Sequence, residues 1–425
     1  MVLTSLADWN HWWKKGDVES ELLGKERITI REVKKSFNFR EIKLLIGIRR
    51  SGKSTLFYQL ISHLLKQGTN PKEIVLINFE DDILSNITLR DAFTKYQSNI
   101  NPDTKPYLFI DEVHRCKEWA LFLRKLYDLK KVKQIFITDS SSKFIKSEYA
   151  RVLTGRSISL SIFPLSFAEY IEWNKIHYNK AINMDDINKI KKHLLEYLQW
   201  GGFPEVFSKK MAAKKILLTE YFSNIIDKDI IERYNLNYSK IKPLADFLVS
   251  NGTKIFSTRK YSRTYGLSLE SINTYIQYFK DVSLFFFLPK FSYSIKAQEL
   301  SSKKIYVSDQ GFFNNLGFRF SENIGRTYEN AVFTELKRRG KELFYWKDNY
   351  ECDFLVKEGI KIKEAIQVCY ELTDDNKGRE VKGLIEALDK FNLKKGLIIT
   401  SDLEKKETIN NKKIKYIPLW KWLLE

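Results

Sequence analysis

Cysteine is scarce in this chain of 425 residues, which has only three, at positions 116, 352 and 369. No two of them form a CxxC motif, so the sequence excludes a disulfide framework and a zinc ribbon. We expect Cys116, Cys352 and Cys369 to be reduced thiols in the core.

Long apolar runs are also missing. The longest lies around residues 284–288, far below the roughly 20 residues that a bilayer span needs. The N-terminal segment carries Asp8, His11, Lys14 and Lys15 where a signal peptide would have an apolar core. We therefore expect a soluble, cytoplasmic protein that does not associate with membranes.

Basic residues, by contrast, are abundant: 72 Lys and Arg against 53 Asp and Glu give a formal charge of +19. Such an excess indicates a polyanionic partner, and nucleic acid is the leading candidate. With 43% hydrophobic and 14% aromatic residues, the chain can bury several cores, which excludes wholesale disorder.

Only eight prolines and no low-complexity linker interrupt the sequence, so domain boundaries must be read from changes of pattern. Strand-like runs at 44–46, 74–78, 107–110 and 135–138 alternate with helix-like stretches such as 56–65 and 119–129, which predicts a parallel α/β sheet. Helical patterns follow to about residue 234, then a smaller unit that ends in an aromatic strand pair. From about residue 325, a helix, three strands, a helix and a final strand form another α/β module. We predict four parts: 1–170, 171–235, 236–320 and 321–425.

The strongest motif is a GxxxxGK[ST] loop between an apolar strand and an amphipathic helix. Backbone N–H groups of such a loop wrap phosphates, its lysine reaches the β and γ phosphates, and its hydroxyl ligates Mg²⁺. We predict a nucleotide site with Lys53 in a catalytic role and Ser54 as a metal ligand. The predicted nucleotide-binding residues are Gly47, Ile48, Arg49, Arg50, Ser51, Gly52, Lys53, Ser54 and Thr55.

A second element, the apolar run 107–110 followed by Asp111 and Glu112, ends in two acids where α/β sheets bind ligands. We predict that Asp111 belongs to the Mg²⁺ shell and that Glu112 orients and deprotonates the attacking water. At the end of the next strand, Thr138 or Ser140 is placed to sense the γ-phosphate, and the alternative is an ordinary polar turn.

Two arginines near residue 155 are candidates for an arginine finger, which would reach the nucleotide of a neighbouring subunit. They are Arg151 and Arg156, of which Arg156 is the preferred candidate. The alternative is a solvated arginine with no catalytic role.

These motifs resemble a family of archaeal and bacterial AAA+-like ATPases, in which the ATPase module is followed by a winged helix and a domain related to PD-(D/E)XK nucleases. The resemblance covers nearly the whole chain and implies an α/β fold with a P-loop AAA+-like parallel sheet, a helical lid (171–235), a winged helix (236–320) and a nuclease-like α/β domain (321–425). It rests on segments 47–54, 108–112, 139–142, 153–156, 163–167 with Glu169, 201–205 and 227–230. Members usually have glycine where this chain has Asp139, so the sensor geometry is expected to differ.

The middle part contains a candidate recognition helix. Ser268 is expected to cap it, and Leu269, Ile272, Ile276 and Phe279 form one apolar stripe. The other face carries small polar side chains, and basic residues precede the helix. This arrangement is typical of a helix that binds in a DNA groove. The predicted DNA-binding residues are Arg259, Lys260, Arg263, Ser271, Asn273, Thr274 and Gln277. The alternative is a winged helix used only for packing.

In the C-terminal module, Glu329 and Asp353 match the acidic positions of the nuclease-like core that the resemblance implies. The second acid of the motif reads Gln367 here, and the position of the water-activating lysine reads Cys369. We therefore expect a degenerate nuclease site at Glu329, Asp353 and Gln367, in a domain retained for DNA binding or assembly.

The preferred interpretation is an ATPase that uses ATP and Mg²⁺, binds duplex or branched DNA, and couples hydrolysis to movement on or remodelling of that DNA. We expect a homo-oligomer, with a hexameric ring among the candidate forms. The alternatives are an ATP-regulated nuclease and a slow nucleotide switch that orders a protein assembly.

Overall fold

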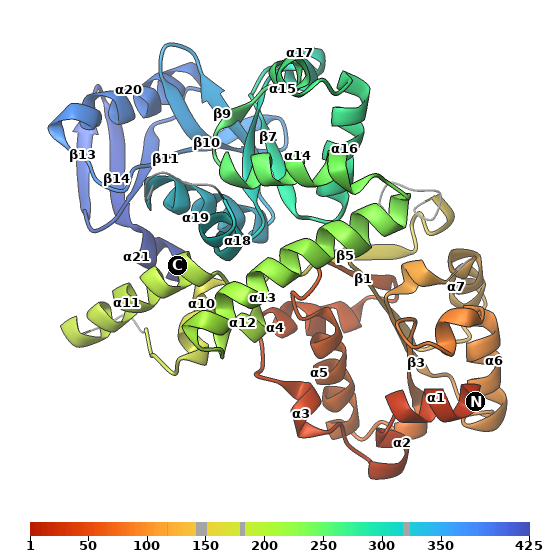
Figure 1. Ribbon diagram of the computed structural model, residues 1–425. Helices are drawn as coiled ribbons and strands as arrows, with labels where there is room; N and C mark the ends of the chain where they lie inside the picture. The colour runs from red at the N-terminus through yellow and green to blue at the C-terminus, as the bar shows by residue number, and fades with distance from the viewer. Residues whose placement is uncertain (117, 142–150, 179–182, 318–323) are drawn as a thin grey trace. The chain divides into compact units, whose positions relative to one another are not determined.

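The computed structural model describes residues 1–116, 118–141, 151–178, 183–317 and 324–425 (Figure 1). They fall into two compact units, Met1–Phe163 and Pro164–Glu425. The structure groups the last three predicted parts into the second unit. Within the described residues, no helix combines the length and apolarity needed to cross a membrane.

The first unit is built on a five-stranded parallel sheet with the strand order β2-β3-β4-β1-β5. The strands are β1 (Ile42–Ile46), β2 (Ile74–Asn78), β3 (Tyr107–Asp111), β4 (Gln134–Asp139) and β5 (Ser157–Ser161). The four predicted strands are confirmed. Strand β5 was not predicted, because its alternating serines at the sheet edge give no apolar run.

Helices cover both faces of this sheet, as buried parallel strands require. On one face Ile77 and Ile110 pack with α1, α6 and α7, and on the other Leu76 and Phe109 pack with α2, α4 and α5. The helices are α1 (Val2–Trp9), α2 (Trp12–Lys15), α3 (Ser20–Leu23), α4 (Thr29–Lys35), α5 (Lys53–Lys66), α6 (Leu89–Asn99) and α7 (Trp119–Asp128). A 3-10 turn, η4 (Val113–Arg115), follows β3.

The second unit begins with the predicted run of helices. They are α10 (Phe167–Trp173), α11 (Met184–Trp200), α12 (Pro204–Phe207), α13 (Met211–Asn224) and a π-helix, η5 (Ile225–Glu232). Tyr197 and Leu198 of α11 share one hydrophobic core with Val332 and Trp420 near the C-terminus. The segment predicted as a lid therefore contributes to the core of the second unit.

The middle region forms a three-stranded antiparallel sheet with the order β6-β8-β7 and its own helices. The elements are α14 (Tyr238–Ser250), β6 (Ile255–Phe256), α15 (Thr258–Tyr265), α16 (Leu269–Asp281), β7 (Phe285–Pro289), α17 (Ile295–Leu300), β8 (Lys303–Val307) and α18 (Gln310–Asn315). The Ser268 hydroxyl caps α16, as predicted, by accepting from the N–H of Ser271 at 3.1 Å. The predicted apolar stripe is only partly buried: Ile272 and Phe279 are covered, but Leu269 is 42% exposed in the first turn.

The C-terminal region forms a six-stranded mixed sheet with the order β13-β14-β12-β11-β10-β9. Its elements are α19 (Ile324–Arg338), β9 (Glu342–Lys347), β10 (Glu351–Glu358), β11 (Lys361–Val368), α20 (Asp374–Lys390), β12 (Lys395–Thr400), β13 (Lys405–Ile409), β14 (Lys412–Pro418) and α21 (Leu419–Leu424). The prediction of one final strand is wrong, because β12 is followed by the β13–β14 hairpin and a helix. That hairpin turns at Asn410 and Asn411, both with positive φ, which is the conformation of a tight hairpin turn.

All three cysteines are free and buried, as the sequence predicts.

Candidate functional site

The loop between β1 and α5 has the backbone that the GxxxxGK[ST] pattern predicts. Gly52 precedes α5 with a φ of 95°, a left-handed conformation that favours glycine. A Cβ at Gly47 would lie 1.9 Å from the carbonyl oxygen of Ile162, so only glycine fits there. The loop runs directly into a helix N-terminus, whose free N–H groups and partial positive charge suit a phosphate.

Lys53 is buried, and its ammonium donates to the carbonyl oxygens of Gly47 at 2.9 Å and Ile48 at 3.3 Å. In the same loop, Ser51 Oγ is buried and has no hydrogen-bond partner within the described residues. Both groups can donate to phosphate oxygens, so the loop fits a nucleoside triphosphate.

Asp111 lies at the carboxyl end of β3, and its carboxylate is hydrogen-bonded by the Ser54 hydroxyl. Burial and the neighbouring charge of Glu112 raise the pKa of Asp111. A hydroxyl and a carboxylate are the oxygen ligands that Mg²⁺ prefers, so this pair fits the metal that the motif implies.

Thr138, one of the two candidate sensors, is fully buried. Its hydroxyl donates to the Asp111 carboxylate and accepts from the backbone N–H of Glu112, the latter at 3.0 Å. These contacts orient both acids, and the sensor role stays a prediction. Ser140 is also fully buried, and Ser142 lies outside the described residues.

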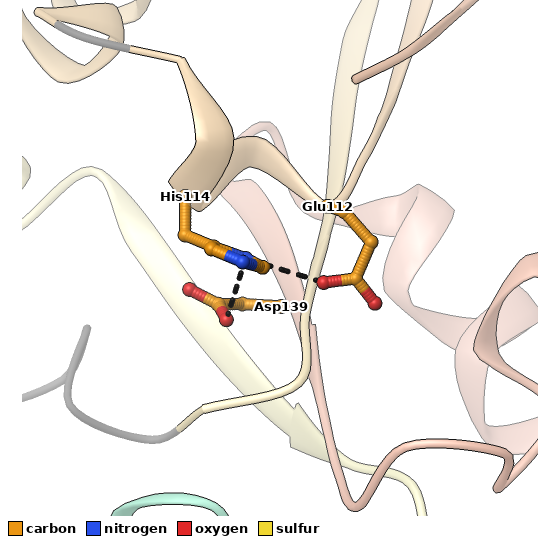
Figure 2. A group of neighbouring side chains, drawn as sticks. All are labelled: Glu112, His114 and Asp139. Carbon is orange, nitrogen blue, oxygen red and sulfur yellow. Dashed lines mark ion pairs between the residues drawn. The ribbon is translucent and has the colours of Figure 1, made fainter. Parts of the chain in front are cut away.

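Glu112, His114 and Asp139 form a cluster next to these acids (Figure 2). His114 Nδ1 lies 3.2 Å from Glu112 Oε2 and 3.4 Å from Asp139 Oδ1. Burial would lower the pKa of His114, but the two carboxylates outweigh it and raise this pKa to about 9. At neutral pH the imidazolium therefore bridges the predicted catalytic base and Asp139.

The pKa of Glu112, by contrast, is lowered. Burial alone would raise the pKa of this carboxyl, but His114 and then Lys53 hold it well below the usual range. Glu112 is thus ionised but, while paired, weakly basic. No sequence motif indicates a role for His114, because only the folded turn places its ring between the ends of two strands.

Arg156, the preferred finger candidate, pairs with Asp128 at the end of α7, with Nε 2.7 Å from Oδ1. Arg151 is exposed. Arg49 lies 2.6 Å from Glu80 and Arg50 is exposed, both at the rim of the loop. A role in trans for Arg156 stays a prediction.

Arg27 supports the loop from outside the motif. This buried guanidinium donates to the carbonyl oxygens of Ser51 at 2.8 Å and Phe163 at 3.1 Å. A lone arginine far upstream carries no motif, so the sequence could not indicate this contact.

The predicted DNA-binding residues differ in exposure. Arg259, Lys260 and Arg263 on α15 are exposed, as are Asn273 and Thr274 on α16. Ser271 is half-buried at the cap. Gln277, also half-buried, donates to Asp281 at 2.6 Å.

The three predicted residues of the degenerate nuclease site do lie together, around a cavity of about 480 Å³. Gln367 accepts from the N–H of Asp353 at 3.2 Å and donates to Glu380 at 2.6 Å. Lys304 of β8, which the sequence did not indicate, reaches Glu329 at 2.7 Å and Asp353 at 3.0 Å.

Comparison with known proteins places these sites in context. Residues 39–171 match an AAA domain, and residues 191–323 and 324–422 match two domains of unknown function, DUF8612 and DUF4143. The chain is 36% identical to the uncharacterized protein MJ1544 of Methanocaldococcus jannaschii, over 95% of this chain and 93% of that protein. The chain belongs to the same family as MJ1544.

An uncharacterized protein of Haemophilus influenzae is 27% identical over 89% of this chain and 94% of its own length. The AAA domain is a P-loop ATPase domain, and its match spans the phosphate loop, Asp111, Glu112, Thr138 and Asp139, whereas Arg27 precedes it. The Walker-type ATPase PABY2304 of Pyrococcus abyssi aligns with a TM-score of 0.43 and 13% identity, over 71% of this chain and 97% of that chain. The winged-helix and nuclease-like assignments stay predictions.

Proposed function

We propose that this protein is a Mg²⁺-dependent ATPase that binds DNA and couples hydrolysis to movement on or remodelling of duplex or branched DNA. The observation that carries the ATPase part is the hydrogen-bonded set of Ser54, Asp111 and Thr138, next to Glu112 and behind a phosphate loop with a buried Lys53.

Each residue has a distinct task in this proposal. Lys53 donates to phosphate oxygens in place of the carbonyl oxygens of its own loop. Ser54 and Asp111 would hold Mg²⁺. When bound there, Mg²⁺ would neutralise charge on the phosphates. A carboxylate oxygen of Glu112 accepts a proton from the attacking water. The His114 imidazolium competes for that carboxylate, so release of Glu112 from His114 precedes proton transfer.

The DNA part rests on charge and on element order. The chain has a formal net charge of +19. Three basic side chains of α15 are exposed, and so are polar side chains of α16. The order is α14, β6, α15, α16, β7, α17, β8, with one antiparallel sheet. Apart from the short α17 between the last two strands, this is the order expected of a winged helix. Basic side chains on such a unit would contact DNA phosphates, and side chains of α16 would contact the edges of the nucleobases.

The test is steady-state ATP hydrolysis, alone and with single-stranded, duplex and four-way-junction DNA at fixed low salt. Lys53→Ala should abolish turnover, whereas Lys66→Ala, at the exposed end of the same helix, should not change it. Glu112→Gln should bind ATP but lose about 100-fold or more in turnover, because the amide cannot accept the proton. Full activity of Lys53→Ala would refute the nucleotide site, and equal rates with and without every DNA would refute the coupling.

One observation favours a second function, a slow nucleotide switch that orders a protein assembly. His114, which also pairs with Asp139, holds the catalytic base Glu112 in an ion pair, and this pairing slows turnover. A slow rate that no DNA changes, together with oligomerisation that depends on ATP, would support the switch.

A further inference from the structure

Lys304 is a buried cation surrounded by carboxylates. It lies on β8, before the C-terminal sheet, and its side chain is 3% exposed. Its Nζ atom is 2.7 Å from Glu329 Oε1, 2.9 Å from Glu351 Oε1 and 3.0 Å from Asp353 Oδ1. The ammonium donates hydrogen bonds to Glu351 and Asp353 and forms an ion pair with Glu329, so three carboxylates hold it.

The carboxylates are also held by other groups. The Tyr306 hydroxyl donates to Glu329 at 2.6 Å, and the N–H of Val368 donates to the second oxygen of Asp353 at 3.0 Å. Lys347 lies 3.4 Å from Glu351. The carboxylates are therefore fixed around one point, which Lys304 occupies.

The three Nζ–O distances are typical of an ammonium held by carboxylates, whereas a divalent metal would need the carboxylate oxygens closer to its centre. Charged N–H···O contacts are about 2.7–2.9 Å long, whereas Mg²⁺–oxygen distances are about 2.0–2.1 Å and Ca²⁺–oxygen distances about 2.3–2.6 Å. Burial alone would lower the pKa of Lys304, but Glu329 and the neighbouring acids raise it well above the usual value. The ammonium thus stays charged.

We propose that Glu329, Glu351 and Asp353 form a cation site whose permanent occupant is the ammonium of Lys304, so that a divalent cation binds there only when this ammonium is removed. A buried ammonium that is held by three carboxylates is not placed to orient a water. The wild-type C-terminal region accordingly does not cleave nucleic acid with a divalent metal. The proposal does not depend on the nucleotide site.

The experiment titrates Mn²⁺, without nucleotide, into the full-length wild type and the Lys304→Met variant, and follows bound Mn²⁺ by electron paramagnetic resonance. Lys304→Met should gain one Mn²⁺ site, with a rise in thermal midpoint of roughly 5 °C at 100-fold saturation. The wild type should gain neither. Lys303→Met removes the neighbouring ammonium of the same strand and should behave like the wild type. Adding Asp353→Asn to Lys304→Met should abolish the gained site.

Two results would overturn the proposal: no Mn²⁺ site in a folded Lys304→Met variant, or wild-type Mn²⁺ binding or Mn²⁺-dependent DNA cleavage that Asp353→Asn removes. If Lys304→Met does not fold, the triple variant Lys304→Met, Glu329→Gln, Asp353→Asn decides. It should fold, because two of the three negative charges that need a cation are gone. A triple variant that also fails to fold would show that the ammonium does more than balance these carboxylates, against the proposal.

Discussion

His114 Nδ1 lies 3.2 Å from Oε2 of Glu112, the residue that we assign as the catalytic base (Figure 2). The same nitrogen lies 3.4 Å from Asp139 Oδ1 at the end of the neighbouring strand. One imidazolium thus bridges the carboxyl ends of β3 and β4. Glu112 has a φ of 49°, and the 3-10 turn η4 that follows it carries His114.

The first prediction concerns turnover. His114→Asn should raise kcat several-fold at pH 7, because Glu112 loses the cation that keeps its pKa low and becomes a better proton acceptor. The wild type should approach the variant as the pH rises through about 9, where His114 loses its proton. The measurement is kcat against pH for both proteins. A variant slower than the wild type would mean that His114 positions Glu112 for reaction instead of restraining it.

The same pair predicts a pH dependence of stability. The pKa of His114 is about 9 in the folded protein, above the value of about 6.5 expected when unfolded. Its contribution is therefore complete below about pH 6.5 and is lost as the pH rises to about 9. Thermal unfolding of the wild type and His114→Asn should differ most near pH 6 and converge near pH 9.5. A difference that grows with pH would contradict the charged state assigned to His114.

Much of the nucleotide site was predictable because its signals are local. A few adjacent residues encode each of these signals, as at Lys53 and Asp111. The signals are a glycine loop with its lysine and hydroxyl, and two acids that follow an apolar strand. Arg27, Lys304 and the pairing of His114 with Asp139 depend on segments distant in sequence that the fold brings together. Periodicity carries no information on such contacts.

The C-terminal module shows the same limit. Glu329, Asp353 and Gln367 were expected to share a site and line one cavity. The lysine in that site comes from β8, outside the motif, so a search two residues after the second acid found only Cys369. Strands β5 and β13 were missed because each lies at a sheet edge and has no fully buried residue, so neither gives an apolar run.

The third prediction tests the hydrogen bonds behind the acids. Thr138→Val keeps the shape of the side chain but removes the hydroxyl that bonds to Asp111 and to the Glu112 N–H. Mg²⁺ affinity in the presence of ATP should fall by about 10- to 100-fold, as for other residues that orient a metal ligand. Thr94→Val, at an exposed position of α6, serves as the matched control. A variant with wild-type Mg²⁺ affinity but slow turnover would instead favour the γ-phosphate sensor role.

The fourth prediction concerns DNA. Replacing Arg259, Lys260 and Arg263 by glutamine should weaken binding to all duplex sequences similarly, because phosphate contacts carry no sequence information. The slope of log K against log salt should become less negative by up to about 2.7 if each base contacts one phosphate. A control triple of exposed lysines, with glutamine at Lys361, Lys363 and Lys406, removes the same charge elsewhere in the second unit. Equal losses in both triples would mean that net charge alone attracts DNA, and α15 would then not be the contact surface.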